Sequence, residues 1–475
     1  MSIDESRSSQ SSYPPTQPRN YDPLTDTANN LYTLITNKFH SIRHDKIEDR
    51  YAPPKYKSQN YKNEIEGANI AISKIVLDLN LESINDLNTL QYATAHVLSS
   101  LTDNRKQYNT HVKPKRNPYS KLERSIFKKR QLIGRLTNAN QNRMKKKGLY
   151  KLKKIMQDRT IQEQLQIERM KLSALCQKMK RMKAKKIRFI NNNMFLNNQK
   201  KLFQKLQGVK LNKISDPPQQ PEIDNFWTTT LSIPTQHNKS ATWLKSEKLI
   251  RRDTPQDTWT DITTEDLRKN LKKLRNWKAP GLDKVQNFWI KKLHTLHSPM
   301  AKAFNHICQH PESMPKWMTE GTTTLIYKKG KESLPKNYRP ITCLPTTFKL
   351  LTLLLSNKIY DHITLSTPSH APILQLEQKG FRKKSRGCKD QLLIDKCITK
   401  NNNNTNINFA WIDYEKAYDS IPHSWIEEVL HLYKIDPTTS NFIIQSMKTW
   451  KTKMYLHHKN STTTTKTIPI RRGIF

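Results

Sequence analysis

Apolar side chains recur along the chain with two different periods, and these periods predict where helices and strands lie. Helical spacing, with apolar residues three or four positions apart, is found in residues 63–81, 161–190, 264–277 and 346–363. Alternation typical of strands occurs at residues 323–327 and 341–343, on either side of a basic loop. Because both patterns occur in one chain, the sequence predicts an α+β fold.

A helix is expected to begin at Thr263, where Asp266 stands at the position that completes a capping box, with Asp in place of Glu. Pro280 and Gly281 end the helical pattern that follows. Near the other end of the chain, residues 424–435 and 441–451 are predicted helices. A hairpin is expected to follow them, turning at Lys459-Asn460.

The run "INFAWI", residues 407–412, lies directly before Asp413. Its side chains are apolar on both faces of an extended strand, as in a central strand that is covered on each side. The pattern therefore predicts a buried strand that ends in a carboxylate. Asp419 follows six residues later, just before a proline and a predicted helix.

Composition changes along the chain and predicts five parts. These are a disordered segment (1–55), a small helical segment (56–110), a basic helical nucleic-acid-binding region (111–214), a linker or extension (215–259) and a mixed domain (260–475). The first part is expected to be disordered because its start is rich in Ser, Pro, Gln and Asn. The linker is inferred from the prolines of "SDPPQQPEIDNFW".

The charge balance calls for a polyanionic partner. Lys and Arg number 83 against 40 Asp and Glu, which gives a net charge of +43. Residues 111–210 hold 30 of these cations and only four acids. This region binds phosphates, forms a solvated charged face or weak coiled coil, or carries a nuclear-import signal in "KRMKAKKIR". No apolar run is long enough for a membrane span, and the N-terminus lacks a signal-peptide core.

A carboxylate at a strand end beside basic residues suggests a site for Mg²⁺, which prefers oxygen ligands and substrate phosphates. The basic residues surround the predicted hairpin-like turn: Lys328, Lys329, Lys331, Lys336 and Arg339. Such a turn can close over a triphosphate, although a basic surface loop is the commoner explanation. Asp413 alone could equally cap the helix or turn that follows it.

Four stretches, in order, resemble the reverse transcriptase domain of non-LTR, LINE-type retrotransposons. They are "NWKAPGLDKVQNFWIKKL", "LIYKKGKESLPKNYRPITCLPTTFKLLTLLLSNKI", "EQKGFRKKSRGCKDQLLIDKCI" and "AWIDYEKAYDSIPHSWI". The resemblance covers about residues 260–475, less than half the chain. It implies a right-hand polymerase fold, with fingers and a partial palm preceded by the basic helical region and the disordered N-terminus. The sheet of that palm would be small and antiparallel, and the helices at 424–435 and 441–451 would cover it.

The resemblance also implies roles for single residues. Asp413 matches the aspartate that binds both metal ions, and Tyr414 lends its backbone carbonyl to the second. Tyr418 matches the aromatic residue that stacks under the incoming sugar and excludes a 2′-hydroxyl. Arg339 matches the arginine that contacts the triphosphate. Lys328 is the best candidate for its lysine companion, and Lys329 is the alternative.

A template-holding group and the partners follow in the same way. The basic residues expected to hold the template backbone are Arg382, Lys383, Lys384 and Arg386. A complete enzyme would use two Mg²⁺ ions, dNTPs, an RNA template and a DNA primer or target, with no membrane. Integration at chromosomal DNA would require access to the nucleus, so nuclear localisation is expected.

The sequence departs from the family pattern after "RRGI", where the family continues with a Gln-Gly pair and later an aromatic-x-Asp-Asp hairpin. That hairpin supplies the remaining metal-binding carboxylates, and no other stretch of the chain offers a replacement. We therefore expect little or no polymerase activity from this chain alone, as a fragment or a degenerate copy. The alternative is a non-catalytic nucleic-acid-binding remnant of a retroelement.

Overall fold

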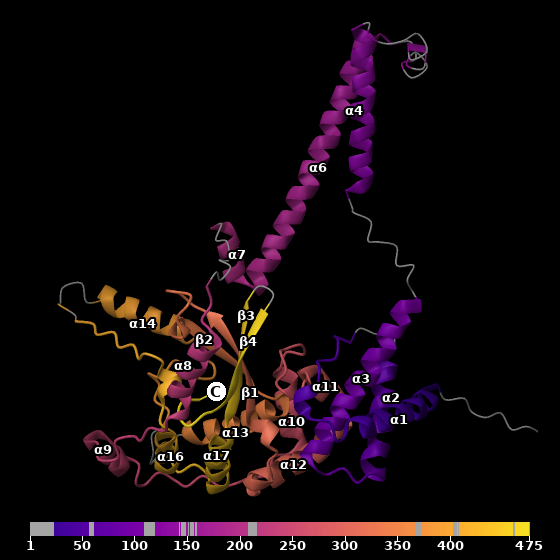
Figure 1. Ribbon diagram of the computed structural model, residues 1–475. Coiled ribbons are helices and arrows are strands. Elements are labelled where there is room, and N and C mark those ends of the chain that lie inside the picture. Colours follow the sequence, from indigo (N-terminus) through magenta and orange to yellow (C-terminus); the bar gives the residue numbers. More distant parts are fainter. Residues whose placement is uncertain are drawn as a thin grey trace, which may run out of the picture. The chain divides into compact units, whose positions relative to one another are not determined.

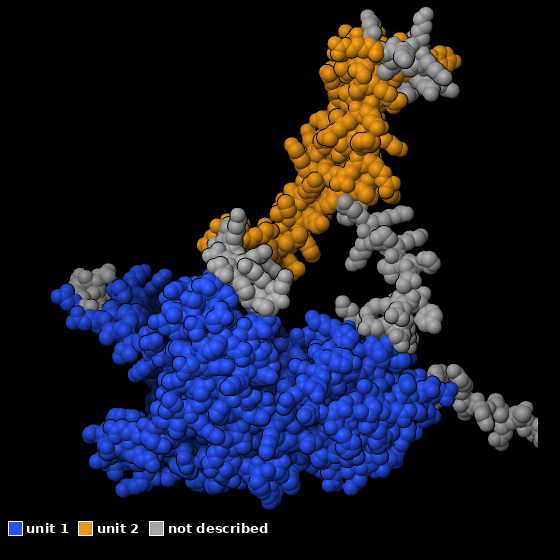
Figure 2. Space-filling view, viewed as in Figure 1, with its two compact units in different colours: residues 1–105, 214–475 blue, residues 106–213 orange. Residues whose placement is uncertain are grey.

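The structure is a computed structural model of the 475-residue chain. It describes residues 23–56, 61–108, 119–141, 143, 149–150, 152, 156, 159–207, 216–365, 372–401, 406, 408–458 and 461–474. The disorder expected for residues 1–22 lies outside this range. The chain divides into two compact units, residues 1–105 with 214–475, and residues 106–213 (Figure 2).

The first unit combines many helices with one small sheet (Figure 1), as the α+β class requires. Its α-helices are α1 (Pro23–Ile42), α2 (Tyr61–Asp78), α3 (Ile84–Tyr108), α8 (Gln220–Ser232), α9 (Thr242–Ile250), α10 (Thr264–Lys273), α11 (Asn287–Lys292), α12 (His297–Gln309), α13 (Thr346–Ile363), α14 (Cys388–Asn401), α15 (Ala417–Ser420), α16 (His423–Leu432) and α17 (Pro437–Thr449). Short 3₁₀ turns are η1 (Ile47–Asp49), η2 (His294–Leu296), η3 (Pro311–Ser313), η4 (Lys316–Thr319) and η5 (Pro335–Asn337).

Helix α1 corrects the expectation that residues 1–55 are disordered throughout. Leu31, Ile35, Phe39 and Ile42 are spaced three or four residues apart, and all four are buried. This apolar stripe packs α1 against α2, so the helix is stabilised by tertiary contacts that the polar composition of the segment hides.

The largest core of the first unit joins helices α1–α3 to residues 262–442. Ala68 and Leu87 from the N-terminal helices belong to the same cluster as Trp289 and Phe304, and all four side chains have no exposed surface. The segment expected at 56–110 therefore shares its core with the mixed domain instead of burying its apolar side chains by itself.

Residues 215–259 were expected to be a linker or extension whose prolines break helices, but the structure forms helices α8 and α9 there. Pro221 lies in the first turn of α8, where a missing backbone N–H does no harm. Gln219 and Glu222 form a capping box there. Ile223 and Trp227, both about 1% exposed, then pack onto the sheet, so the prolines begin a helix instead of preventing one.

The sheet has four strands in the order β2-β1-β3-β4. They are β1 (Glu320–Tyr327), β2 (Tyr338–Cys343), β3 (Lys451–His458) and β4 (Ser461–Pro469). Both predicted hairpins are confirmed in their strand pairing, because β1–β2 and β3–β4 pair antiparallel. The turn predicted at Lys459-Asn460 lies outside the described residues. The two hairpins join through a parallel β1–β3 pair, so the expected purely antiparallel sheet is wrong. Helix α8 covers one sheet face, a place that we had expected α16 and α17 to take.

The second unit is a helical hairpin followed by a short helix (Figure 1). It consists of α4 (Ser120–Asn140), α6 (Ile161–Asn197) and α7 (Gln199–Leu206). A small core of Leu136, Ala139 and Leu165 joins α4 to α6. Lys129 Nζ on α4 lies 2.5 Å from Glu168 Oε2 on α6, which adds an ion pair with a buried carboxylate. Among the described residues, no helix of either unit is long and apolar enough to cross a membrane.

Candidate nucleotide and nucleic-acid site

The β1–β2 hairpin carries the two cations that were predicted to hold a triphosphate. Arg339 lies directly opposite Ile326 in the antiparallel register. The backbone N–H of Lys328 donates to the carbonyl of Asn337 at 2.9 Å, so the pairing continues past the end of β1. Residues two apart on a strand share a face, and so do residues that are directly opposite. Lys328 and Arg339 therefore project from one face of the hairpin, and both are exposed.

The loop of this hairpin is held by its own hydrogen bonds. Gly330 has a φ of +95°, a conformation that other residues rarely adopt. The Tyr327 hydroxyl donates to the carbonyl of Gly330 at 2.6 Å, and Asn337 Nδ2 donates to the carbonyl of Lys331 at 2.8 Å. The backbone that carries Lys328 and Arg339 is thus held in one conformation, so the two charges keep a constant position relative to a bound ligand.

The segment before Asp413 is not the buried strand that its apolar pattern predicts. Residues 408–414 form no helix or strand, and Trp411 and Ile412 are 76% and 80% exposed. A strand needs a hydrogen-bonded neighbour, and within the described chain no strand pairs with these residues. Asp413 consequently lies on an exposed, extended segment.

Tyr418 contacts the basic loop that precedes α14. Its ring lies edge-on to the ring of Phe381, with 6.4 Å between the centroids, and it is 53% exposed. Its backbone carbonyl accepts a hydrogen bond from Ile474 N–H at 2.9 Å. Nearby, Gly473 approaches Asp419 so closely that a Cβ atom would lie 2.8 Å from the Asp419 carbonyl oxygen. Burial raises the pKa of Asp419, which is consistent with a structural position at this turn.

The four cations expected to hold the template divide into two pairs. Arg382 Nη1 donates to the carbonyls of Leu374 and Gln375 at 3.0 and 2.7 Å. Lys383 Nζ lies 4.0 Å from the centroid of the Tyr360 ring. These two side chains therefore help to fix the loop itself.

Lys384 and Arg386 form the second pair. Both are exposed, and within the described residues neither side chain makes a hydrogen bond or ion pair. Lys384 has a φ of +65°, so the loop turns sharply there. Of the four, these two have their charges available for a ligand.

Helix α14 follows this loop as predicted, but it is exposed. Leu392 and Leu393 are 58% and 63% exposed, and no residue of α14 is buried. Together with residues 408–418, the helix leaves a group of large apolar side chains on the surface.

The described residues do not form a metal site. No group of three or more His, Cys, Asp or Glu side chains that could hold an ion occurs among them. Asp413 offers a single exposed carboxylate, whereas a two-metal centre needs several oxygen ligands around ions about 4 Å apart. The residues present thus do not fit the two Mg²⁺ ions that the family resemblance implies.

A buried polar cluster behind the hairpin was not predicted. Asp283 has no exposed surface, and its Oδ2 accepts from the backbone N–H of Thr346 at 3.1 Å, the first residue of α13. Asn88 Nδ2 on α3 lies 3.5 Å from the same oxygen. Arg50 Nη1 donates to Asn88 Oδ1 at 2.7 Å. Burial raises the pKa of Asp283 to about 6, although the Lys349 and Arg50 charges oppose this shift.

Gly281, two residues earlier, explains why this loop can lie against the end of β2. A Cβ atom at Gly281 would come within 2.3 Å of the Leu344 carbonyl carbon and the Pro345 nitrogen. The loop therefore clamps the chain between β2, which bears Arg339, and α13. The "APGLD" letters were visible in the sequence, but only the fold shows what they contact.

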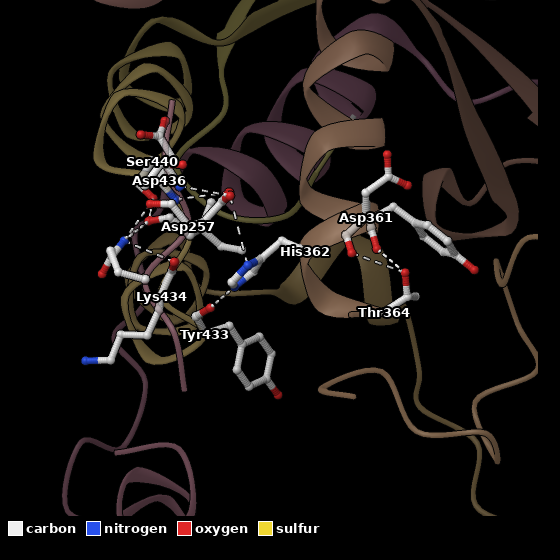
Figure 3. Close-up of polar contacts among 12 residues, drawn as sticks. Asp257, Asp361, His362, Thr364, Tyr433, Lys434, Asp436 and Ser440 are labelled. Atoms are coloured by element: carbon white, nitrogen blue, oxygen red, sulfur yellow. Dashed lines mark hydrogen bonds and ion pairs between the residues drawn. The ribbon is translucent and has the colours of Figure 1, made fainter. Parts of the chain in front are cut away.

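A second polar cluster ties the other end of α13 to the α16–α17 turn (Figure 3). His362 Nε2 donates to the carbonyl of Tyr433 at 2.8 Å, and its Nδ1 lies 4.0 Å from Asp257 Oδ1. Asp436 caps α17 by accepting from Thr439 N–H at 2.7 Å. Asp257, His362, Asp436 and Thr439 border a pocket of about 390 Å³. Each polar group named here serves a cap or a loop contact, so the cluster is structural.

The loop and the second strand of the β1–β2 hairpin lie in a part of the chain that matches a known protein family. Residues 326–470 match the model of the family described as reverse transcriptase (RNA-dependent DNA polymerase). This stretch contains the end of β1, β2, α13, the basic loop, Asp413 and the whole β3–β4 hairpin. The chain therefore carries a reverse transcriptase domain.

Named relatives place that domain among those of non-LTR retrotransposons. A Pol polyprotein from the type-1 retrotransposable element R2 of Popillia japonica is 28% identical over 220 residues, 46% of this chain and 28% of its own length. A probable RNA-directed DNA polymerase from transposon BS of Drosophila melanogaster is 27% identical over 34% of this chain and 18% of its own. The RNA-directed DNA polymerase from mobile element jockey of Drosophila funebris is 26% identical over 40% and 20%. The matches span less than a third of each relative.

Proposed function

We propose that residues 260–475 form the fingers and the first part of the palm of an RNA-directed DNA polymerase of the non-LTR type. Such an enzyme extends a DNA primer with dNTPs along an RNA template. The observation that carries this proposal is the β1–β2 register, which gives Lys328 and Arg339 the same exposed face. Both residues lie within the stretch that matches the reverse transcriptase family.

The residue roles follow from charge and shape. Lys328 and Arg339 would bind the triphosphate, with the planar guanidinium able to contact two phosphate oxygens at once. Tyr418 would place its ring beside the sugar and exclude a 2′-hydroxyl. Asp413 and the Tyr414 carbonyl would become metal ligands once further carboxylates join them. Lys384 and Arg386 would contact the template, while Arg382 and Lys383 hold their loop in place.

The chain on its own should have little or no polymerase activity. A single exposed carboxylate cannot hold two Mg²⁺ ions against their charge repulsion at a separation of about 4 Å. The exposed apolar side chains of α14 and residues 408–418 would become buried when the remainder of a palm packs on them. An element that integrates in chromosomal DNA would also bring this protein into the nucleus.

Binding of nucleotide tests the hairpin without requiring catalysis. We expect Lys328→Ala and Arg339→Ala each to weaken dNTP binding by about tenfold to a hundredfold, because each removes a charged contact worth about 1.5–3 kcal/mol. Lys316→Ala is the matched control, since this exposed lysine lies just before β1, at the end of the strand away from the loop. Equilibrium binding of a labelled dNTP to the full chain gives the answer. An equal loss in all three variants would reject the shared face.

Primer extension tests the catalytic assignment. In a protein that continues this chain with the Asp-Asp hairpin of a relative, Asp413→Asn should abolish dNTP incorporation and leave template binding nearly unchanged. Incorporation that survives the substitution would remove Asp413 from the mechanism. Strong incorporation by the 475-residue chain alone would contradict the proposed inactivity.

A second candidate function is nucleic-acid binding without catalysis, as a remnant of a retroelement. The observation that favours it is the exposed position of Asp413, with no metal-ligand cluster in the described part of the chain. The same continued protein separates the two candidates. If it binds primer and template with normal affinity but never incorporates dNTPs, the protein binds nucleic acid without catalysis, as the second candidate function states.

A further inference from the structure

Phe381, in the basic loop before α14, combines two features that seldom occur in one residue. Its φ is +57°, in the left-handed region that residues with a Cβ atom rarely adopt. Its side chain is 92% exposed, more than any other large apolar side chain in the described part of the chain. Burial therefore does not offset the cost of this backbone conformation. Strain of this kind is typical of sites where a residue has a function besides stabilising the fold.

Contacts on both sides of Phe381 hold its backbone in this conformation. On the N-terminal side, Gln378 Nε2 donates to the carbonyl of Gly380 at 3.1 Å. On the C-terminal side, the backbone N–H of Lys383 donates to the hydroxyl of Tyr360 at 3.1 Å. Tyr360 belongs to α13, whose leucines lie in the largest core of the first unit. The loop is thus attached to a buried helix, and the backbone that carries the Phe381 ring has a fixed position.

The ring of Phe381 is placed against the ring of Tyr418. The two centroids are 6.4 Å apart and the ring planes are inclined by 86°, which is a favourable edge-to-face arrangement. Within the described residues, the Tyr418 hydroxyl makes no hydrogen bond and no other aromatic ring lies against Tyr418. The contact with Phe381 therefore favours one orientation of a side chain that is otherwise half exposed.

The backbone of Tyr418 is fixed independently of this ring contact. Lys416, the residue before α15, has a φ of +50°, and its Nζ lies 4.4 Å from the ring centroid of Phe226 on α8. The backbone N–H of Asp419 donates to the carbonyl of Lys416 at 2.9 Å, and that of Ile474 donates to the carbonyl of Tyr418 at 2.9 Å. These contacts determine where the Cα atom of Tyr418 lies, but they leave rotation about its Cα–Cβ bond free.

We propose that Phe381 is a positioning residue, which holds the Tyr418 ring in the orientation that excludes a 2′-hydroxyl. Side chains exchange between staggered rotamers unless a contact favours one of them. A tyrosine in another rotamer would leave space beside the sugar, and a ribonucleotide would then fit. One edge-to-face contact shifts such an equilibrium by about twofold to tenfold toward the paired orientation.

The inference rests on the proposed function, in which Tyr418 lies beside the sugar of a bound dNTP. It adds a residue that determines the selectivity for the sugar, and it gives the basic loop a role besides template contact. Lys328 and Arg339 would contact the triphosphates of dNTPs and rNTPs alike. Loss of the Phe381 ring should therefore strengthen binding of the ribonucleotide and leave binding of the deoxynucleotide nearly unchanged.

Competition of dATP and of ATP against labelled dATP on the full chain tests the inference. The measured quantity is the ratio of the ATP dissociation constant to the dATP dissociation constant. Phe381→Ala should lower this ratio by about twofold to tenfold, through tighter binding of ATP. Phe381→Tyr keeps the ring and should retain the wild-type ratio. Leu376→Ala is the matched control, because it removes another exposed apolar side chain near this loop and should leave the ratio unchanged.

A double-substitution cycle shows whether Phe381 acts through Tyr418. Tyr418→Ala should lower the ratio more than Phe381→Ala does, because it removes the excluding ring itself. In the Tyr418→Ala background, Phe381→Ala should have no further effect, since residues that act through one contact are not additive. Equal factors in both backgrounds, or an unchanged ratio in Phe381→Ala, would overturn the inference. A wild-type chain that binds no dATP would instead refute the proposed function.

Fluorine NMR of the chain with 3-fluorotyrosine incorporated at position 418 follows the ring contact without any nucleotide. The resonance should shift in Phe381→Ala, because the neighbouring ring current is lost, and it should stay in place in Leu376→Ala. Circular dichroism should show unchanged helix content in both variants. A resonance that is identical in Phe381→Ala and the wild type would mean that the two rings are not in contact in solution. That result would overturn the inference whether or not the chain binds dNTPs.

Discussion

Helices α13 and α14 are both rich in leucine, but only one of them is buried. Leu351 of α13 has no exposed surface and lies in the core that joins the N-terminal helices to the mixed domain. Leu393 of α14 is 63% exposed, and the extended segment after it leaves Trp411 76% exposed. The difference cannot be read from the apolar content of either segment.

The comparison shows that periodic spacing of apolar residues indicates which face of an element is apolar, but not which other element packs against that face. Around α13, the described chain supplies α10, α3 and the loop with Gly281, and each brings its own apolar or close-packed surface. Around α14 and residues 408–414 it supplies no comparable surface. Exposed apolar patches of this kind mark interaction sites. The polymerase proposal assigns this patch to the remaining palm.

The largest expected effect comes from the buried side of the comparison. Phe304→Ala empties a fully buried site in α12 and should lower the free energy of unfolding by about 3–5 kcal/mol. Trp411→Ala, at an exposed site, should change it by about 0.5 kcal/mol or less. Urea unfolding followed by circular dichroism measures both. A loss above about 1 kcal/mol in Trp411→Ala would show that the segment is packed in solution.

The next effect is a pH dependence of the free energy of unfolding, which arises from the buried carboxyl group of Asp283. The folded-state pKa of Asp283 is about 6 and its ordinary value is 3.8, so the folded chain holds this proton more tightly than the unfolded chain. Its stabilising contribution is therefore complete below about pH 4 and is lost as the pH rises through 6. A difference of 6 − 3.8 pKa units corresponds to about 3 kcal/mol.

Asp283→Asn keeps a neutral side chain at every pH and isolates this effect. The unfolding free energy of the wild type minus that of Asp283→Asn should fall by about 3 kcal/mol between pH 4 and pH 7. Denaturant titrations at closely spaced pH values provide the measurement. A difference that rises with pH would mean that Asp283 is ionised and paired with Arg50 instead.

Local patterns were sufficient wherever an element is completed by its neighbours in sequence. The Thr263 capping box, helix α13 and both hairpins were predictable, because caps and turns are short-range features. The shared face of Lys328 and Arg339 also follows from a period of two in a hairpin. Asp283 was missed because its partner Asn88 lies 195 residues away.

The failures have the same origin in long-range contacts. The parallel pairing of β1 with β3 joins Glu320 to Lys451, and nothing local indicates it. Helix α8 was misread because prolines end helices more often than they begin them, and its packing on the sheet is not visible in sequence. The buried strand expected at 407–412 was an inference about a partner that the described chain does not contain, and its first residue lies outside the described range.

Alanine substitutions at two glycines should change the stability by smaller amounts and in opposite directions. Gly281→Ala should destabilise the chain by about 1–3 kcal/mol, because its Cβ would meet backbone atoms of Leu344 and Pro345. Gly134→Ala in α4 meets nothing within 4 Å and should raise helix stability by about 0.5–1 kcal/mol. Thermal unfolding resolves both signs. A neutral Gly281→Ala would mean that the loop does not clamp the end of β2.

The smallest stability effect is expected at α14, and it sharpens the comparison most. Leu393→Gln should change the unfolding free energy by about 0.5 kcal/mol or less, because the side chain is already solvated. Leu351→Gln, the same change in α13, should lower this free energy by about 3 kcal/mol, because it buries an unpaired amide. If α14 is an assembly surface, Leu393→Gln should also reduce self-association in sedimentation, since the apolar patch then offers less area to other molecules. A chain that stays associated despite normal stability would place its contact surface away from α14.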